Sequence, residues 1–546
     1  MTYWSTFGDD EYVGLAPWTC LELITAEPRR PFPYLGGVAP EVMVGLHEAH
    51  GLLWSALDEA VCDVLCRGAK PGDPRLRTLL EDAYAEVVRS RAHLSQHIRC
   101  GREPDGAFRW GFPLEPGQSA TVTFTGCDLE NALTKQTAAV DFKRPILPAI
   151  GKILGELDGT CRVADVRANA VAAGPEIEGD LVCFLESLHR LQCVTRSAQP
   201  SDCIRWNAET RDQDVIHLGH AGLLYRQRGG WLLFDPWLVP WYAEAPVPSL
   251  CRAILPRPSA IFLTHEHDDH MNSKTLLQMP KDIPVIVPSR TNRRALFYDY
   301  PSVLRELGYE RIVELAHGEQ WAFDGGMVKA LPFYGEDPCD LELPRNCYLI
   351  SDRGRNTLVL ADSGPTNDGR SPVKDGVIGD LVQKYGSISV VFGSQQQTIE
   401  VRGQSGYGFL SHPGRWLETG ESTCVSSQDS AQLVASAKAR WFISYATGGA
   451  DWFPEHVPWL FRRDRPARNA LTTVNTDSLE KLAGLLKEAD CQYHYSHALD
   501  IVRAMPDGGA EVLSAAKALD PLKMFELEHP DHPLLRTVKE SWVAES

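Results

Sequence analysis

The pattern of apolar and polar residues divides the chain near residue 206. Before it, apolar residues recur at every third or fourth position and predict amphipathic helices over residues 40–68, 74–98 and 178–194. The stretch 120–126 has the composition of a short strand. Residues 199–213 are polar and suit a linker. We therefore expect a mixed, largely helical N-terminal domain over residues 1–205.

After residue 206, short apolar runs bounded by glycine and proline alternate with helical patterns. The predicted strands lie within 214–238, 259–270, 283–288, 327–334, 346–352, 356–364, 387–394 and 439–449. An Arg-Gly-Gly turn divides the first of these stretches into two strands. The predicted helices lie within 273–279, 291–308, 430–439 and 478–489. We expect an α/β sandwich over 206–512, with sheets inside and helices outside, and a helical C-terminal extension over 513–546.

Composition and charge narrow the class of protein. The chain of 546 residues is too long for one ordinary domain, and 43% hydrophobic and 23% charged residues are typical of a globular protein. A net charge of −18 without any Lys/Arg run argues against a nucleic-acid partner. We see no secretion signal and no apolar stretch of bilayer-spanning length, so we expect a cytoplasmic protein without membrane contact. The 14 cysteines form no C-x-x-C pair and are expected to be reduced thiols.

The densest chemical signal is the stretch THEHDDH at 264–270, which directly follows the apolar run AIFL. Imidazole nitrogen and carboxylate oxygen together suit first-row divalent metals. His265 and His267 are two positions apart, so on an extended segment they point the same way. Asp269 and His270 follow on a turn and would reach a second metal beside the first. One segment therefore predicts half of a dinuclear metal site.

With this motif, residues 206–512 resemble the metallo-β-lactamase superfamily. Asp235 in LLFDPWL stands at the place of the family's first aspartate and is expected to orient the metal loop by hydrogen bonding. Asp362 in LVLADSG matches the aspartate that bridges the two metals. The stretch HLGHAGLLY resembles the lactonase and phosphodiesterase branch. It leaves open whether His217 and His220 belong to the site or to the core. The resemblance implies an αββα sandwich.

Two departures from the superfamily pattern carry chemical information. Where most of its hydrolases have a further metal-binding histidine, this chain has none, and Glu336 stands there, with His317 and Glu342 as alternatives. The last family histidine is replaced by Ser444 and Tyr445. The remaining substitutes for it are His456, His494 and His497, or no residue at all.

A carboxylate in place of an imidazole adds negative charge and a hard oxygen ligand, which favours iron or manganese over zinc. This departure, with the N-terminal domain, resembles the diiron β-hydroxylases of antibiotic pathways, of the kind found in chloramphenicol biosynthesis. The resemblance implies that one iron is bound by His265, His267 and Glu336, the other by Asp269 and His270, with Asp362 as the bridge. Glu336 and Asp362 would be the catalytic members of this set.

The same resemblance implies substrate and partners. Such enzymes use two iron ions, cycling between Fe²⁺ and Fe³⁺, and O₂ to hydroxylate the β-carbon of an aminoacyl group. That group is tethered to a carrier domain of a nonribosomal peptide synthetase. Two external electrons per turnover imply a reductase, and residues 1–205 would dimerise or dock the synthetase. The alternative is a zinc- or manganese-dependent hydrolase of the lactonase or phosphodiesterase type, in which a metal-bound hydroxide attacks the substrate.

Overall fold

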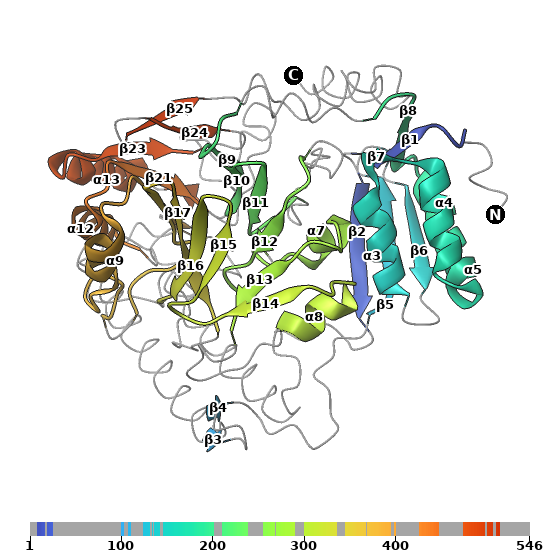
Figure 1. Ribbon diagram of the computed structural model, residues 1–546, viewed down its shortest axis with the longest axis horizontal. Coiled ribbons are helices and arrows are strands. Elements are labelled where there is room, and N and C mark those ends of the chain that lie inside the picture. The colour runs from blue at the N-terminus through green and yellow to red at the C-terminus, as the bar shows by residue number, and fades with distance from the viewer. Residues whose placement is uncertain are drawn as a thin grey trace, which may run out of the picture.

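Two large sheets dominate the part of the chain that this computed structural model describes (Figure 1). The described residues are 8–16, 19–25, 100–102, 108–110, 124–131, 134, 136–141, 146–200, 210–238, 255–267, 269–289, 300–335, 344–366, 369–394, 398–399, 425–446, 473–474, 476–496, 500–505 and 509–513. Within them, no helix is both long and apolar enough to cross a membrane.

The first sheet has eight strands and holds the strand that leads into the histidine-rich motif. Its order is β14 (Ile312–Leu315), β13 (Val285–Pro288), β12 (Ala260–Phe262), β11 (Gly230–Phe234), β10 (Gly222–Gln227), β9 (Val215–Gly219), β24 (Ile501–Ala504) and β25 (Ala510–Leu513). Strands β11 to β14 are parallel, and β10 is antiparallel to both of its neighbours. Strands β9, β11 and β12 therefore end at the same edge of the sheet.

The second sheet has seven strands and faces the first. Its order is β15 (Gln320–Phe323), β16 (Gly326–Pro332), β17 (Asn346–Asp352), β18 (Arg355–Val359), β19 (Val390–Ser394), β21 (Trp441–Tyr445) and β23 (Gln492–Tyr495). Strands β15 to β18 are antiparallel, and β18, β19, β21 and β23 are parallel. Parallel strands buried on both faces read as continuous apolar runs, which is why the sequence marks them so clearly.

Alternation along each strand sends side chains to two different cores. In β12 and the residue after it, Ala260 and Phe262 enter the core between the sheets, whereas Ile261 and Leu263 face the outer layer. In β17, Tyr348 lies in the core between the sheets, and its neighbours along the strand face the other side. The period of two in a strand places apolar residues on both faces, so each sheet must be covered on its outside as well.

Helices provide that outer cover. The second sheet is covered by α9 (Val377–Tyr385), α12 (Ser427–Ala437) and α13 (Thr476–Glu488), and the first by α7 (Ser273–Gln278) and α8 (Tyr300–Glu306). The order helix, sheet, sheet, helix confirms the predicted αββα sandwich. Two strand pairs stand apart from it, namely β20 (Thr398–Ile399) with β22 (Thr473–Val474), and β3 (Cys100–Arg102) with β4 (Phe108–Trp110).

The described N-terminal residues combine strands and helices. Two three-stranded sheets, ordered β7-β1-β8 and β2-β5-β6, pack with three helices. The elements are β1 (Tyr12–Leu15), β2 (Thr19–Thr25), β5 (Phe124–Asn131), β6 (Thr137–Asp141), α3 (Leu147–Glu156), β7 (Asp158–Arg162), α4 (Val163–Ala172), α5 (Pro175–Arg190) and β8 (Val194–Ser197). The helix predicted over 178–194 corresponds to α5. Those predicted over 40–68 and 74–98 lie outside the described residues, as does the extension after Leu513.

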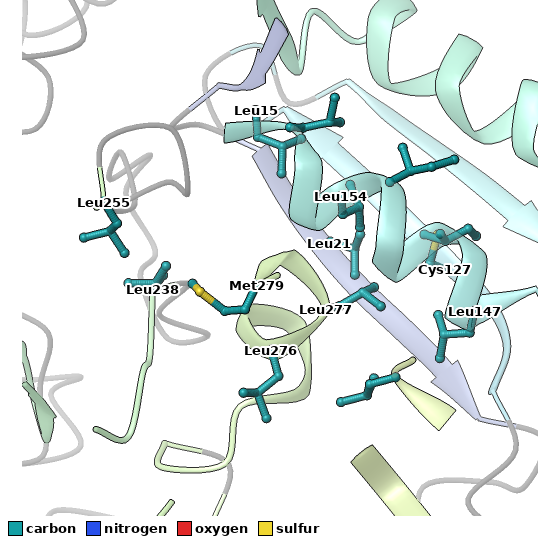
Figure 2. Close-up of a cluster of buried hydrophobic side chains, with 14 of the residues drawn as sticks. Leu15, Leu21, Cys127, Leu147, Leu154, Leu238, Leu255, Leu276, Leu277 and Met279 are labelled. Atoms are coloured by element: carbon teal, nitrogen blue, oxygen red, sulfur yellow. The ribbon is translucent and has the colours of Figure 1, made fainter. Parts of the chain in front are cut away.

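One apolar cluster joins the N-terminal elements to the outside of the first sheet. Figure 2 shows Leu21 of β2 beside Leu277 of α7, and Leu15, Leu154 and Met279 belong to the same cluster. Helix α3 comes very close there, because a Cβ at Gly155 would lie 2.6 Å from the carbonyl oxygen of Met279. The N-terminal elements therefore form one of the outer layers of the sandwich. The domain boundaries drawn from the sequence stay a prediction.

The structure has one more turn in 214–238 than the sequence pattern predicted. Besides the Arg-Gly-Gly turn before β11, the chain reverses between β9 and β10. Gly219 (φ 103°) and His220 (φ 45°) take left-handed conformations there. Only glycine adopts such a conformation readily, so a histidine in it is held by its surroundings.

Candidate metal centre

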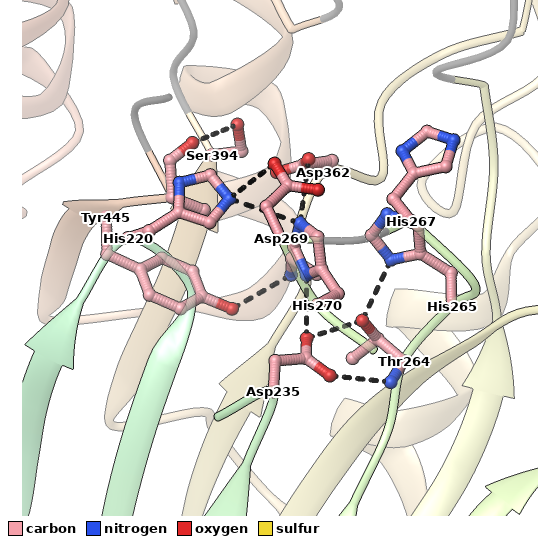
Figure 3. A network of polar contacts seen from close by, with 12 residues as sticks. His220, Asp235, Thr264, His265, His267, Asp269, His270, Asp362, Ser394 and Tyr445 are labelled. Atoms are coloured by element: carbon pink, nitrogen blue, oxygen red, sulfur yellow. Dashed lines mark hydrogen bonds and ion pairs between the residues drawn. The ribbon is translucent and has the colours of Figure 1, made fainter. Parts of the chain in front are cut away.

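The histidine-rich motif leaves β12 at the edge where β9 and β11 also end (Figure 3). The carboxyl ends of parallel strands are where open α/β sheets bind ligands. Four residues other than glycine that follow strands of the two sheets have positive φ angles: His220 (45°) after β9, Asp235 (39°) after β11, Ala361 (50°) after β18 and Ala446 (53°) after β21. Backbone strain of this kind persists only where the surrounding structure enforces it, and it gathers at functional sites.

Asp235, which follows β11, fixes the start of the motif. Its carboxylate accepts hydrogen bonds from the Thr264 backbone N–H at 2.8 Å and from the Thr264 hydroxyl. It also accepts from His270 Nδ1 at 2.9 Å. These contacts agree with the orienting role expected from the sequence. All three residues are fully buried, so the position of the loop is tightly set.

The same contacts fix the tautomers of two histidines. A carboxylate only accepts, so His270 Nδ1 carries a proton. The single hydroxyl proton of Thr264 goes to Asp235, so His265 Nδ1, at 2.9 Å from that hydroxyl, must donate to it. In each neutral ring, Nε2 therefore presents a lone pair. This is the arrangement in which a hydrogen bond at Nδ1 prepares an imidazole to bind a metal through Nε2.

Ligand atoms from three segments converge on His270. Its Nε2 lies 3.1 Å from Asp362 Oδ2 and 3.3 Å from His220 Nε2. His220 Nε2 is in turn 3.1 Å from Asp269 Oδ2. The ligand atoms of these four residues all lie within 4.8 Å of one another. Asp235, His265 and His270 form a second group by the same measure. The sequence left the place of His220 open, and the structure brings its side chain into the site.

The charges of the site are tightly coupled. Burial lowers the pKa of His270, but the Asp362 and Asp269 carboxylates and the hydrogen bond to Asp235 raise it well above its usual value. Burial raises the pKa of Asp269, but the His270 and His220 imidazoles outweigh it, so the net shift is downward. A positive charge is therefore strongly favoured at this point.

Asp362 follows β18, and a hydrogen bond from β21 of the same sheet supports the loop that carries it. The preceding residue, Ala361, donates its backbone N–H to the Tyr445 hydroxyl at 3.0 Å. Asp362 is 3% exposed, and its Oδ1 has no hydrogen-bond partner among the described residues. An anionic oxygen is rarely buried without a partner, because desolvation costs several kcal/mol. The free oxygen fits a metal ligand.

His267 lies beside the group but outside it. Its ring is 4.6 Å from that of His265, and its Nε2 is 3.0 Å from Arg345 Nη2. Arg345 also pairs with the buried carboxylate of Glu266, through Nε at 3.0 Å and through Nη2. Sequence reasoning missed Arg345 and Glu266. No local signal marks Arg345, which lies 79 residues from its partner Glu266.

The start of β17 reinforces this connection between the sheets. The Asn346 backbone N–H donates to the Thr264 carbonyl at 2.8 Å. The Tyr348 hydroxyl donates to the Leu263 carbonyl at 2.6 Å. With the Arg345 ion pair, three successive contacts from the second sheet hold the motif that extends from the first.

Several predicted ligands are placed elsewhere or lie outside the described residues. The predicted ligands outside the described residues are Glu336, its alternative Glu342, and the histidines His456 and His497. The described chain before Glu336 ends at Gly335, where a Cβ would lie 2.6 Å from the carbonyl oxygen of Pro365, three residues after Asp362. This places the chain before Glu336 beside the Asp362 loop.

Two of the alternatives contact other partners. His317 Nε2 lies 3.0 Å from the carbonyl oxygen of Arg345, and His494 Nε2 lies 2.8 Å from Asp500 Oδ2. Neither belongs to the two ligand groups of the described residues. Among the described residues, each of these side chains is directed to another acceptor, and their role as substitutes for the missing histidines stays a prediction.

Comparison with known proteins relates part of the chain to a known domain family. Residues 230–374 match the beta-lactamase superfamily domain. The matched residues include the THEHDDH motif, Asp235 and Asp362, so the superfamily domain contains both ligand groups apart from His220.

A curated relative adds a narrower likeness. Over 163 residues, the chain is 35% identical to the 4-amino-L-phenylalanyl-[CmlP-peptidyl-carrier-protein] 3-hydroxylase of Streptomyces venezuelae. The match spans 29% of this chain and 30% of that protein, which is less than a third of either.

Solved structures extend the likeness in fold beyond the superfamily domain. CmlA, a diiron beta-hydroxylase from Streptomyces venezuelae, matches with a TM-score of 0.51 at 18% identity, over 92% of this chain and 99% of that one. A mutant of the CmlA beta-hydroxylase gives a TM-score of 0.50 at 17% identity, over 90% and 100%. The predicted resemblance to the superfamily and to its diiron β-hydroxylases is confirmed.

Proposed function

We propose that this protein is a dinuclear-iron oxygenase that hydroxylates a carrier-tethered aminoacyl group. The convergence of His270, Asp269 and Asp362 at the strand ends carries the proposal. These residues offer imidazole and carboxylate ligands without a thiolate, the donor set that suits iron or manganese. The sequence likeness to a carrier-protein-dependent 3-hydroxylase supports the reaction.

In this proposal the ligands divide between two metals. His265, His267 and Glu336 hold one iron, Asp269 and His270 hold the other, and Asp362 bridges them. His265 and His270 would bind through Nε2, since their Nδ1 protons are directed to Thr264 and Asp235. His267 would exchange its contact with Arg345 for the metal. Two iron ions would supply the activation of O₂ and the cleavage of the substrate C–H bond.

The protein's own residues fix the positions of the ligands. Asp235 and Tyr445 are fully buried, and their hydrogen bonds support the motif and the loop of Asp362. One oxygen atom of O₂ enters the β C–H bond of the aminoacyl group, and the other leaves as water. Two external electrons and two protons are required for this, which is why a reductase partner is part of the proposal. The carrier domain would dock on the N-terminal domain, and a homodimer is expected.

Iron binding gives the first test. Protein loaded anaerobically with Fe²⁺ should retain about two iron ions per chain and develop visible absorption on oxidation. Asp362→Asn should lose iron, because the substitution removes the bridging charge. Asp324→Asn is the matched control, since Asp324 is 70% exposed and pairs with Arg228 at the surface.

Turnover gives the second test. Iron-loaded protein, a chemical reductant and O₂ are incubated with a carrier domain bearing a phenylalanyl-type aminoacyl group, and mass spectrometry scores the gain of one oxygen atom. Retention of zinc alone, with hydrolysis of a lactone or phosphodiester, would establish the metallo-hydrolase instead.

A further inference from the structure

The turn between β9 and β10 brings a third imidazole into the site. We propose that His220 is a ligand of the second metal, together with Asp269, His270 and the bridging Asp362. This assignment rests on the proposed dinuclear iron site and goes beyond the ligand set drawn from the motif. In this assignment, His220 takes the role of the last family histidine, which Ser444 and Tyr445 replace at the end of β21.

Distances between the ligand atoms fit a shared metal. Ligands about 2.1 Å from a metal are roughly 3.0 Å apart at right angles and roughly 3.4 Å apart in a tetrahedron. His220 Nε2 lies 3.1 Å from Asp269 Oδ2 and 3.3 Å from His270 Nε2. His270 Nε2 lies 3.1 Å from Asp362 Oδ2. The three separations all fall within that range.

Either protons on the two imidazoles or a bound cation would balance the two carboxylates beside them. His270 Nδ1 carries a proton to Asp235, so in the neutral ring its Nε2 is an acceptor, as are both carboxylates. A proton on His220 Nε2 satisfies one acceptor at a time. A single cation between His220 Nε2, Asp269 Oδ2, His270 Nε2 and Asp362 Oδ2 would be a partner for all four atoms. Asp362 Oδ1 would then bind the other metal of the bridged pair.

The backbone holds His220 in this position at a conformational cost. Its φ of 45° is left-handed, which costs a residue other than glycine roughly 1–2 kcal/mol. Its carbonyl oxygen accepts from the Ala446 backbone N–H at 2.9 Å and lies 2.6 Å from His217 Nε2. The ring packs edge-on against Trp237, with centroids 5.2 Å apart. These contacts direct the imidazole toward the ligand group, and His220 is only 1% exposed.

The hydrogen bond from Ala446 places the end of β21, where the family histidine is missing, beside His220. Strand β21 ends at Tyr445, whose ring lies in the core between the sheets against Phe392, with centroids 5.5 Å apart. Its hydroxyl accepts from Ala361 and supports the loop of Asp362. Strand β21 ends directly beside His220. The imidazole of His220, from the turn between β9 and β10, would therefore serve as the ligand that β21 does not supply. Each iron would then have two imidazole ligands.

Iron stoichiometry and Mössbauer spectra of ⁵⁷Fe-loaded protein test the proposal. The variant is His220→Asn, because asparagine tolerates a positive φ better than most residues. His189→Asn is the matched control, since His189 lies on α5 and outside the ligand groups. Melting of the metal-free proteins confirms that each variant is folded, and His220→Gly serves where the asparagine variant melts early.

In the wild type and the control, we expect about two iron ions per chain. In His220→Asn we expect about one, with at least tenfold weaker binding of the second and the loss of one Mössbauer doublet. Added imidazole should restore the second iron in His220→Gly by filling the space left by the ring. Two irons with unchanged spectra in the variants would mean that His220 only donates a hydrogen bond to Asp269, and would overturn the assignment. A wild type that binds no iron would instead overturn the proposed function.

Discussion

Replacing Arg345 by methionine tests how the second sheet holds the metal-binding motif. The ion pair between Arg345 and Glu266 is buried, with side chains 4% and 0% exposed. Arg345 lowers the pKa of the Glu266 carboxyl against the raising effect of burial. Without the guanidinium, the carboxylate stays buried and loses its principal cation. Breaking a buried pair by removing one partner costs about 3–5 kcal/mol.

The expected loss converts into a change in melting temperature. A unit of roughly 300 residues has an unfolding entropy of about 0.6 kcal/mol per kelvin, so Arg345→Met should lower the melting temperature by about 5–8 °C. Thermal unfolding of metal-free protein measures it, since bound metal would mask the effect. The matched control is Arg257→Met, which breaks an ion pair with Asp282 whose side chains are 49% and 73% exposed. Surface pairs contribute about 0–1 kcal/mol, so the control should shift the melting temperature by less than about 2 °C.

A double variant separates lost attraction from a stranded charge. Arg345→Met combined with Glu266→Met leaves no buried charge and fills a similar volume, so it should regain most of the lost stability. Equal melting temperatures for Arg345→Met and Arg257→Met would refute the reasoning. So would a double variant that is less stable than Arg345→Met alone, because the buried carboxylate would then not be the source of the cost.

Three further substitutions test other contacts. Asp235→Asn should weaken metal binding about 10- to 100-fold, because an amide N–H₂ donor replaces one of the two oxygens that orient the motif; metal titration measures it, and unchanged affinity would contradict the orienting role. Tyr445→Phe should cost about 1–3 kcal/mol in chemical denaturation, because the Ala361 N–H loses its acceptor; a neutral result would show that water replaces it. Gly155→Ala should destabilise by about 1–3 kcal/mol, since the new methyl group meets a backbone oxygen of the α7 region. Gly179→Ala on α5 is the control, because a Cβ there meets nothing within 4 Å and should not destabilise the protein. Equal losses of stability in the two variants would rule out the close helix contact at Gly155.

The layers of the fold were predictable because each depends on local pattern. Strand β12 is a short apolar run ending in polar ligands, and α7 follows an asparagine cap at Asn272 whose side chain accepts from Thr275. Periods of two and of three to four residues mark such elements directly. Strands β14 and β15 were not predicted, since half-buried strands with mixed residues give a weaker period. The turn at His220 was missed because its left-handed backbone is enforced by contacts distant in sequence.

The sequence by itself determined the sandwich, the metal-binding motif after β12, and the places of Asp235 and Asp362. Only the tertiary structure decided that His220 enters the ligand group and that Arg345 secures the motif. Spacing along a chain specifies which side chains share a face, but it does not specify which strand ends meet. That meeting depends on strand order and direction in two facing sheets, and these bring residues 50 to 92 positions apart into contact with His270.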